Sequence, residues 1–215
     1  LTDPLTIEVA RSNATNTSIT QVLYKVEESQ KPEVVQHLIR SRDLKQVLVF
    51  SNTKIGASRL SRHLEQCGIK ASAIHGDKTQ QERMAALDAF KAGTVEVLVA
   101  TDVAARGLDI DDLPVVVNLD LPIVAEDYVH RSGRTGRAGA SGEAISLVCA
   151  DEVEQLAAIE LLTKQTLKRI EEAGFEPDHR VPETNASGQV IKKPKKPKKP
   201  KGDAKVVQED VRFRR

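Results

Sequence analysis

The chain has 215 residues, a length that favours one domain of ordinary size with a tail over two domains. Aromatic residues make up only 3% and tryptophan is absent, which argues against nucleic-acid binding by base stacking. The formal net charge of +1 conceals a split, because residues 188–215 hold 11 Lys and Arg against 3 Asp and Glu. The totals of 32 and 31 leave 21 basic and 28 acidic residues in 1–187, so any phosphate site there must come from a local basic patch.

Signals for membranes and secretion are lacking in the sequence. No apolar run is long enough to span a bilayer and no signal-peptide pattern is found, so we expect no membrane partner. The two cysteines, Cys67 and Cys149, stand far apart in apolar-rich surroundings. That placement favours reduced core thiols over a disulfide or a metal pair, and it fits a cytoplasmic location. The chain begins at Leu1 within a polar stretch, and we expect it to be a piece of a longer protein.

Strands and helices are expected to alternate along the chain. After a polar stretch in 1–16 with a candidate strand at 5–9, apolar runs predict strands at 19–26, 46–50, 70–75, 95–100, 115–119 and 143–149. Amphipathic patterns predict helices at 32–42, 54–66, 80–91, 125–131 and 152–172. Thr79 and Glu82 form a capping box at the start of the third helix. Apolar strands between such helices imply an α/β fold, with a parallel sheet covered on both faces.

The composition changes after Gly174. Residues 176–190 contain Pro, Asn and Ser and are expected to form a linker. Residues 192–201 repeat a Pro-Lys-Lys pattern, which favours polyproline II and cannot build a core. This tail is either a solvated spacer or an electrostatic arm for nucleic acid, and a nuclear-import signal would look similar.

Polar residues follow three of the expected strands, at 51–53, 75–77 and 101–109. In parallel sheets, ligands gather outside the carboxyl ends of the strands. The sequence therefore predicts a ligand site along one edge of the sheet. His75 alone is more often a packed residue at a strand end than a ligand, and we leave it out of the site.

Three arginines recur at every third residue of the segment 130–139, and three glycines follow at the same interval: Arg131, Arg134 and Arg137, then Gly133, Gly136 and Gly139. Each glycine costs about 1 kcal/mol relative to Ala inside a helix, so the chain is expected to leave helical geometry near Ser132. Guanidinium groups suit phosphate oxygens bidentately. The pattern favours a polyphosphate site over a solvated loop whose arginines pair with surface carboxylates.

These segments resemble motifs of DEAD-box RNA helicases. Residues 105–110 (Ala-Arg-Gly-Leu-Asp-Ile) and 130–137 (His-Arg-Ser-Gly-Arg-Thr-Gly-Arg) resemble motifs V and VI of that family, and 49–53 resembles motif IV. His-Gly-Asp at 75–77 and Gln-Gln-Glu-Arg at 80–83 resemble its Gly-Asp element and Q-x-x-R motif. Ser132 stands where Ile is commoner in the family. The basic tail and the Gly-Phe-Glu-Pro-Asp element look most like the bacterial RhlE subgroup.

The resemblance implies the RecA-like C-terminal half of an ATP-dependent RNA helicase, which locally unwinds RNA duplexes or remodels ribonucleoproteins. The sequence has no phosphate loop and no Asp-Glu-Ala-Asp box. The family's N-terminal RecA-like domain would therefore precede Leu1 and hold the Mg²⁺ that accompanies ATP, and no metal ligands are expected in this chain. We expect the fragment alone to be inactive. The implied limits are 1–17 for an interdomain linker, 18–174 for the RecA-like domain, and 175–215 for a linker with a disordered basic tail.

The resemblance also implies roles for single residues. Arg134 and Arg137 would act as arginine fingers on the γ-phosphate. Asp109, with Gly107 beside it, would accept a hydrogen bond from the ribose of ATP. The other implied roles are catalysis and interdomain coupling by His130, coupling by Arg131 and Arg106, and contacts with RNA phosphates by Asn52, Thr53, Gly76, Arg83 and Thr101.

Two other interpretations stay open. The chain could be a non-catalytic RecA-like module that binds RNA, or part of a DNA helicase or translocase. RNA and the N-terminal domain are the expected partners, and ribosomal or RNA-decay proteins are further candidates.

Overall fold

The computed structural model describes residues 19–136 and 141–191 of the chain. The expected strand at 5–9, the linker 1–17, Arg137 and the basic tail from residue 192 lie outside the described residues.

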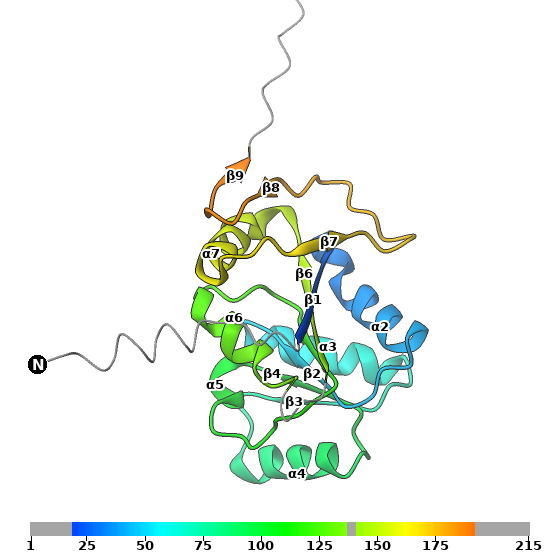
Figure 1. Cartoon of the computed structure of the whole chain (residues 1–215). Helices are drawn as coiled ribbons and strands as arrows, with labels where there is room; N and C mark the ends of the chain where they lie inside the picture. The colour runs from blue at the N-terminus through cyan, green and yellow to red at the C-terminus, as the bar shows by residue number, and fades with distance from the viewer. Residues whose placement is uncertain (1–18, 137–140, 192–215) are drawn as a thin grey trace, which may run out of the picture.

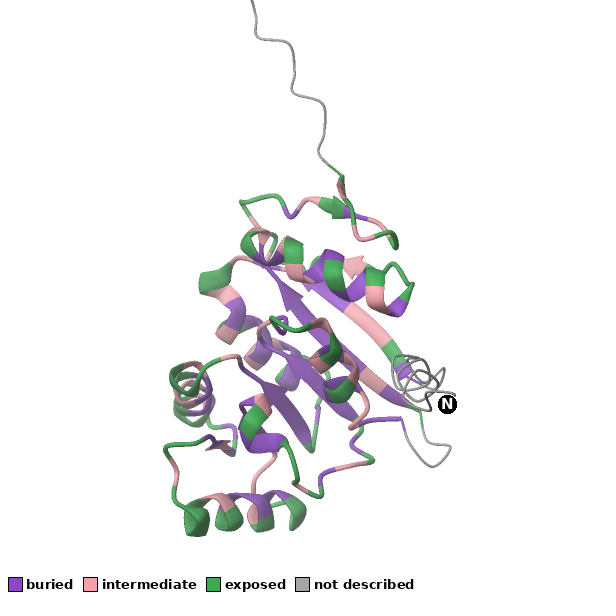
Figure 2. Ribbon diagram, turned by 90° about the vertical axis from the view of Figure 1, so that its left-hand side faces the viewer, coloured by how far each residue is buried: buried purple, intermediate pink, exposed green. Residues whose placement is uncertain are grey.

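A seven-stranded sheet forms the centre of the molecule, in the order β3-β4-β2-β5-β6-β1-β7, and all its strand pairs are parallel. Its strands are β1 (Ile19–Lys25), β2 (Val47–Phe50), β3 (Ala71–Ile74), β4 (Val97–Ala100), β5 (Val115–Asn118), β6 (Gly142–Val148) and β7 (Lys168–Ile170). The central strands β2, β4 and β5 are buried along their whole length, as Figure 2 shows. Burial on both faces explains why these strands are continuous apolar runs.

Helices cover both faces of the sheet (Figure 1). They are α2 (Lys31–Ser41), α3 (Lys54–Gln66), α4 (Gln80–Lys91), α5 (Asp102–Ala105), α6 (Ala125–Ser132) and α7 (Val153–Thr163). Side chains alternate along each strand, so Val49 packs with α2 and α3 whereas the adjacent Phe50 packs with α4 and α5. Helices α6 and α7 cover the same face as α4, over Leu23 and Val148. The predicted α/β fold is confirmed.

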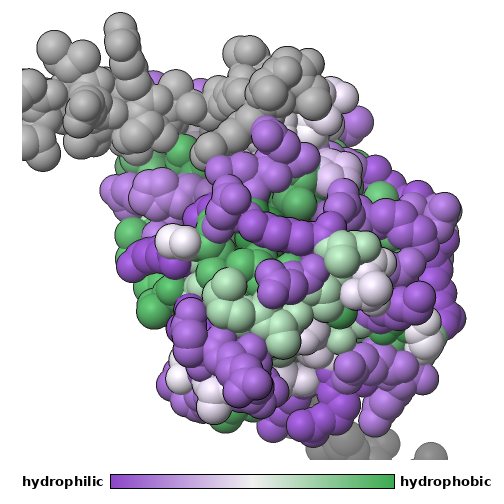
Figure 3. Space-filling view, turned by 90° about the horizontal axis from the view of Figure 1, so that it is seen from below, coloured by the Kyte–Doolittle hydropathy of each residue, from purple (hydrophilic) through white to green (hydrophobic). Residues whose placement is uncertain are grey.

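Local signals in the sequence place α3 and α4 accurately. Both helices have the predicted bounds, and the Thr79–Glu82 capping box is present at the start of α4. Residues Leu87 and Phe90 bury the inner face of α4 against the sheet. On the side of the molecule where α4 lies, hydrophilic side chains alternate with smaller apolar areas (Figure 3). Across 19–136 and 141–191, no helix combines the length and apolar character needed to cross a membrane.

The predicted long helix over 152–172 is wrong. Helix α7 ends at Thr163, Lys164 adopts a left-handed conformation with φ 54°, and the chain continues into β7 beside β1. The cause is Glu160, which is 0% exposed and accepts a hydrogen bond from the backbone N–H of Leu167 at 3.0 Å. A buried carboxylate needs such donors, and the chain must leave the helix to supply them.

Residues 175–191, expected as linker, pack against the domain. The ring of Phe175 lies 5.3 Å from that of His37, and Val181 is buried in the apolar cluster beneath α7. Strands β8 (Glu183–Thr184) and β9 (Val190–Ile191) form an antiparallel pair. Thr184 donates a hydrogen bond to Glu160, and Arg169 pairs with the same carboxylate at 3.4 Å. The predicted limits of the domains stay a prediction, but this segment is held in place.

Replacement of Glu160 tests the buried cluster formed by Glu160, Arg169 and Thr184. Glu160→Ala leaves Arg169 without its most buried partner, and we expect the free energy of unfolding to fall by about 3 kcal/mol. Denaturant titration measures the change. Glu154→Gln, on the exposed side of the same helix, should stay within about 0.5 kcal/mol of the parent. An equally small effect for both variants would contradict this account of how α7 ends.

Candidate functional site

Arg131 on α6 is the most highly connected side chain at the carboxyl edge of the sheet. It is 1% exposed. Its Nε and Nη2 donate to the two carboxylate oxygens of Asp102, each at 2.6 Å. Nη2 also donates to Asn52 Oδ1 at 2.8 Å, and Nη1 donates to Asn118 Oδ1 and the backbone oxygen of Asp120. A guanidinium has five N–H donors, and each of them has an acceptor within the domain.

These contacts join three strand ends. Asn52 follows β2, Asp102 begins α5 after β4, and Asp120 follows β5. The guanidinium carbon also lies 5.1 Å from the ring centroid of Phe50, the last residue of β2, in a cation–π contact. The implied role of Arg131 as a direct contact to a second domain does not fit this placement, because no donor is left over. In this structure Arg131 positions the loops around it.

Arg134 binds the loop at 105–110 to its own segment. Its Nη1 donates to the backbone oxygen of Leu108 at 2.9 Å, its Nη2 donates to that of Ala105 at 3.2 Å, and Asp111 lies 3.6 Å away. The backbone N–H of Leu113 donates to the oxygen of Arg134 itself. The two motif-like segments that the sequence sets about 20 residues apart are therefore one structural unit.

Three polar or charged side chains beside this unit, those of Asp109, Arg106 and His130, point into solvent. Asp109 has 92% of its side chain exposed, Arg106 66% and His130 67%. Asp127 lies between the last two, 3.2 Å from Arg106 and 3.6 Å from His130. Helix α5 ends at Ala105, so Arg106 and Asp109 lie in the loop that follows it.

Gly107 allows this turn of the loop. It has φ +76°, and a Cβ there would meet no atom within 4 Å. The requirement for glycine is therefore conformational rather than steric. The exposed carboxylate of Asp109, whose nearest cation is Lys91 at 3.4 Å, lies two residues further on.

The residues implied in RNA binding lie at the ends of β2, β3 and β4, except Arg83, which lies in the first turn of α4. Thr53 is exposed and caps α3 by accepting the N–H of Gly56. Gly76 is exposed after β3, and a Cβ there would lie 3.3 Å from Lys54 Cε. Thr101 is 9% exposed, and Arg83 is half-buried with Nη2 3.4 Å from the backbone oxygen of Ala104.

Asn52 is the exception in this group, because its side chain is already engaged. Besides accepting from Arg131, it donates to the backbone oxygen of Leu121 at 2.8 Å. Its place in the loop is structural. His75 is packed, as the sequence suggested: it is 6% exposed, its Nε2 lies 2.7 Å from Ser58 Oγ, and its Nδ1 accepts from the N–H of Asp77.

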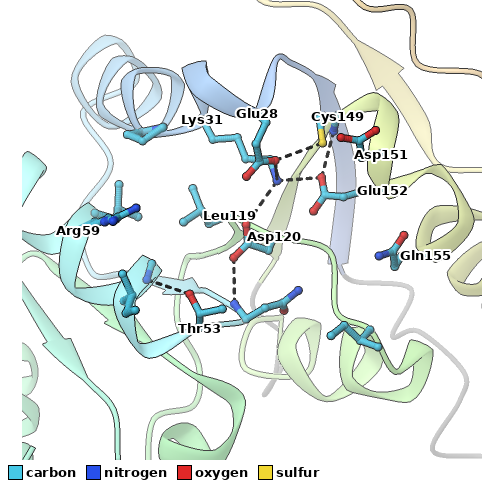
Figure 4. A pocket seen from close by; sticks show the side chains of 16 residues that line it. Glu28, Lys31, Thr53, Arg59, Leu119, Asp120, Cys149, Asp151, Glu152 and Gln155 are labelled. Atoms are coloured by element: carbon cyan, nitrogen blue, oxygen red, sulfur yellow. Dashed lines mark hydrogen bonds and ion pairs between the residues drawn. The ribbon is translucent and has the colours of Figure 1, made fainter. Parts of the chain in front are cut away.

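An open pocket of about 650 Å³ lies beside the loop at 51–53 (Figure 4). Its walls come from the start of α3, the 3-10 turn η1 (Glu28–Gln30), the loop after β5, and the 3-10 turn η2 (Ala150–Glu152). Lys31, 2% exposed, lies on its inner wall. Burial disfavours the charged ammonium, but Glu152 and Asp120 outweigh that effect, and the pKa of Lys31 lies above its ordinary value.

Sequence reasoning missed Lys31, Asp120 and Glu152. Asp120 carries a usable signal, since it stands two residues after the end of β5, as Asn52 stands two residues after the end of β2. Glu28, Cys149 and Glu152 are close enough to hold a metal ion. The ammonium of Lys31 lies 2.9 Å from Glu28 and 2.8 Å from Glu152. Because it already balances these carboxylates, we assign no metal to the group.

Comparison with known proteins places this geometry in a family. A model described as the helicase conserved C-terminal domain matches residues 30–139, just over half of the chain. The fold matches that of the E. coli DEAD-box protein SrmB, solved bound to regulator of ribonuclease activity A. The TM-score is 0.73, with 34% identity over 78% of this chain and 99% of that one. The chain belongs to the DEAD-box helicase C-terminal domains.

Curated relatives of this DEAD-box domain are longer proteins. The ATP-dependent RNA helicase RhpA of Helicobacter pylori is 45% identical over 156 residues, which are 73% of this chain and 32% of that protein. CshA of Bacillus subtilis is 42% identical over 172 residues, 80% of this chain and 35% of that protein. The chain thus spans about a third of the length of these relatives. Membership of the RhlE subgroup stays a prediction.

Cys149, at the edge of the pocket, is expected to be unreactive. Burial and the nearby Glu152 raise the pKa of this thiol to about 12, which leaves roughly one thiolate in 10⁴ at pH 8. We expect iodoacetamide at pH 8 to modify the partly exposed Cys67 well before Cys149, as followed by peptide mass spectrometry. In 6 M guanidinium chloride the two should react alike. Fast labelling of Cys149 in the native chain would contradict its burial.

Proposed function

We propose that this chain is the C-terminal half of an ATP-dependent RNA helicase that locally unwinds RNA duplexes or remodels ribonucleoproteins. One observation carries the proposal. Arg134 joins the loop at 105–110 to the segment at 130–136, and Asp109, Arg106 and His130 are left exposed beside them. Polar and charged groups placed at the edge of a sheet and directed into solvent form half of a site, which a second domain would complete.

The similar proteins support this assignment. RhpA and CshA are ATP-dependent RNA helicases about three times as long as the matched region. A solved structure of Saccharomyces cerevisiae Dbp5 bound to RNA and ADP BeF3 matches with a TM-score of 0.68 and 34% identity over 74% of this chain and 44% of that one. We infer that an N-terminal RecA-like domain is the first partner of this one and that it holds Mg²⁺ with ATP.

On the ATP side, each of the assigned residues has a distinct task. The carboxylate of Asp109 accepts a hydrogen bond from a ribose hydroxyl. Arg134 and Arg137 stabilise the charge that develops on the transferred phosphoryl group. His130 and Arg106, held near each other by Asp127, contact the facing domain. Arg131 is buried and contacts neither ligand nor partner. Its five donors hold the loops that carry these groups in fixed positions relative to one another.

On the RNA side, contacts run along the ends of three strands and the first turn of α4. We call residues 51–53 the RNA-side loop. The exposed start of α3 at Thr53, the backbone at Gly76, and the side chains of Arg83 and Thr101 meet successive phosphates. A helix N-terminus offers free N–H groups to anions, and phosphate contacts carry no base sequence. ATP and RNA together favour the closed arrangement of the two domains, and product release restores the open one.

Arg134→Ala in the intact protein tests the division of labour. We expect kcat for RNA-stimulated ATP hydrolysis to fall by about 10³-fold, since arginine fingers contribute that much or more. Arg62→Ala, on the exposed side of α3, is the matched control and should keep the parental rate. Near-normal turnover by Arg134→Ala would remove this residue from the ATP site. ATP hydrolysis by the 215-residue chain alone would refute the need for a second domain.

Truncation after Ile191 tests the basic tail and keeps β9 intact. The removed residues include 11 Lys and Arg against 3 Asp and Glu. Each RNA phosphate that the tail neutralises contributes about 0.7 to the slope of log affinity against log salt. We therefore expect a shallower slope for single-stranded RNA in the truncated protein, measured by fluorescence anisotropy between 50 and 300 mM KCl. An unchanged slope would make the tail a spacer.

A further inference from the structure

Lys31 is a buried charge outside every motif that the sequence revealed. It is 2% exposed at the first position of α2. Its ammonium lies 2.8 Å from Glu152, 2.9 Å from Glu28 and 3.4 Å from Asp120. Lysine is almost never this deeply buried unless paired, and an unpaired charge there would be costly. Solubility and surface charge therefore do not explain why a lysine stands at this buried position.

Asp120 connects Lys31 to the RNA-side loop. Its Oδ1 faces Lys31, while its Oδ2 accepts two hydrogen bonds, from Ser51 Oγ at 3.0 Å and from the backbone N–H of Asn52 at 2.9 Å. Figure 4 shows this carboxylate between the lysine and the start of α3. One carboxylate oxygen contacts Lys31 and the other contacts the loop. The ion pair with Lys31 therefore fixes the orientation of the carboxylate, and the carboxylate fixes the position of the loop backbone.

The connection continues to Arg131. Asn52, whose N–H is held by Asp120, accepts from Arg131 Nη2 at 2.8 Å, and Arg131 binds Asp102 at 2.6 Å. An unbroken series of polar contacts thus runs from the pocket wall to the start of α5. We call the first three members, Lys31, Asp120 and Asn52, the Lys31 relay.

We propose that Lys31 and Asp120 are positioning residues for RNA: they hold the RNA-side loop, and with it Thr53 and the start of α3, in the geometry that phosphates require. The inference rests on the proposed function. Neither side chain touches the groups assigned to ATP. Their removal therefore weakens the use of RNA without slowing the chemical step once RNA is saturating.

A purely structural role for Lys31 makes a different prediction, and the chain contains a matched control. The cluster of Glu160, Arg169 and Thr184 is also a buried ion pair with a hydrogen-bonded partner, but it ties α7 to β7 and β8, away from the loop. Loss of either pair lowers stability. Only loss of the Lys31 relay should alter the response to RNA.

The test uses the intact protein with Lys31→Met, Lys31→Arg, Asp120→Ala and the control Glu160→Gln. For Lys31→Met and Asp120→Ala we expect the RNA concentration that gives half-maximal ATPase activity to rise about tenfold, with kcat at saturating RNA within about twofold of the parent. Lys31→Arg keeps the charge and should recover most of the RNA response. Glu160→Gln should lower Tm and leave the RNA response unchanged.

Amide hydrogen exchange on the 215-residue chain provides a measurement that does not depend on activity. In Asp120→Ala, the Asn52 amide should exchange about tenfold faster relative to the core amide of Val49, whereas Glu160→Gln should not change that ratio. The inference would be overturned if Lys31→Met and Asp120→Ala, in an active enzyme, both kept the parental RNA concentration for half-maximal ATPase activity. An unchanged exchange ratio in Asp120→Ala would also overturn it. Absence of RNA-stimulated ATP hydrolysis in the unmodified intact protein would instead refute the proposed function. The exchange measurement would then still test whether Asp120 holds the RNA-side loop.

Discussion

The constraint on which the site depends is the satisfaction of one buried guanidinium. A buried charge is tolerated only when it is paired and its hydrogen bonds are made. Arg131 meets that condition with acceptors from β5 and from the segments after β2, β4 and β5. Strand ends that are distant in sequence are thereby fixed relative to one another. The rest of the carboxyl edge, including the loops that carry the exposed groups, is built on this arrangement.

Much of the fold follows from local signals. The β-branched runs of β2, β4 and β5 and the capping box at Thr79 identify a parallel α/β sheet and the start of α4. The end of α7 could not be predicted from such local signals. In the sequence, Glu160 and Glu154 both fit a solvent-exposed helix position. Only the tertiary structure shows that Glu160 is buried and accepts a hydrogen bond from the backbone N–H of Leu167, beyond the end of the helix.

The site shows the same limit. Arg131 and Arg134 occupy equivalent positions in a three-residue repeat, yet Arg131 is fully buried and Arg134 is half-buried over a loop. Because spacing alone cannot give the depth of a side chain, the sequence predicted contacts beyond the domain for both, from Arg134 to the γ-phosphate and from Arg131 to the facing domain. Lys31 precedes Pro32 at a helix start and would be taken for a solvated residue, since its three carboxylate neighbours come from η1 and from positions about 90 and 120 residues later.

The contacts of Arg134 have a consequence for its proposed role at the ATP site. The N–H groups that hold the backbone oxygens of Ala105 and Leu108 are those that a phosphate would take. In the proposed helicase, nucleotide and loop therefore compete for one side chain. Under the proposed role, a phosphate that takes Arg134 would release the backbone oxygens of Ala105 and Leu108 and would loosen the loop that ends at Ile110. Binding of ATP would then change the order of the backbone in the loop at 105–110.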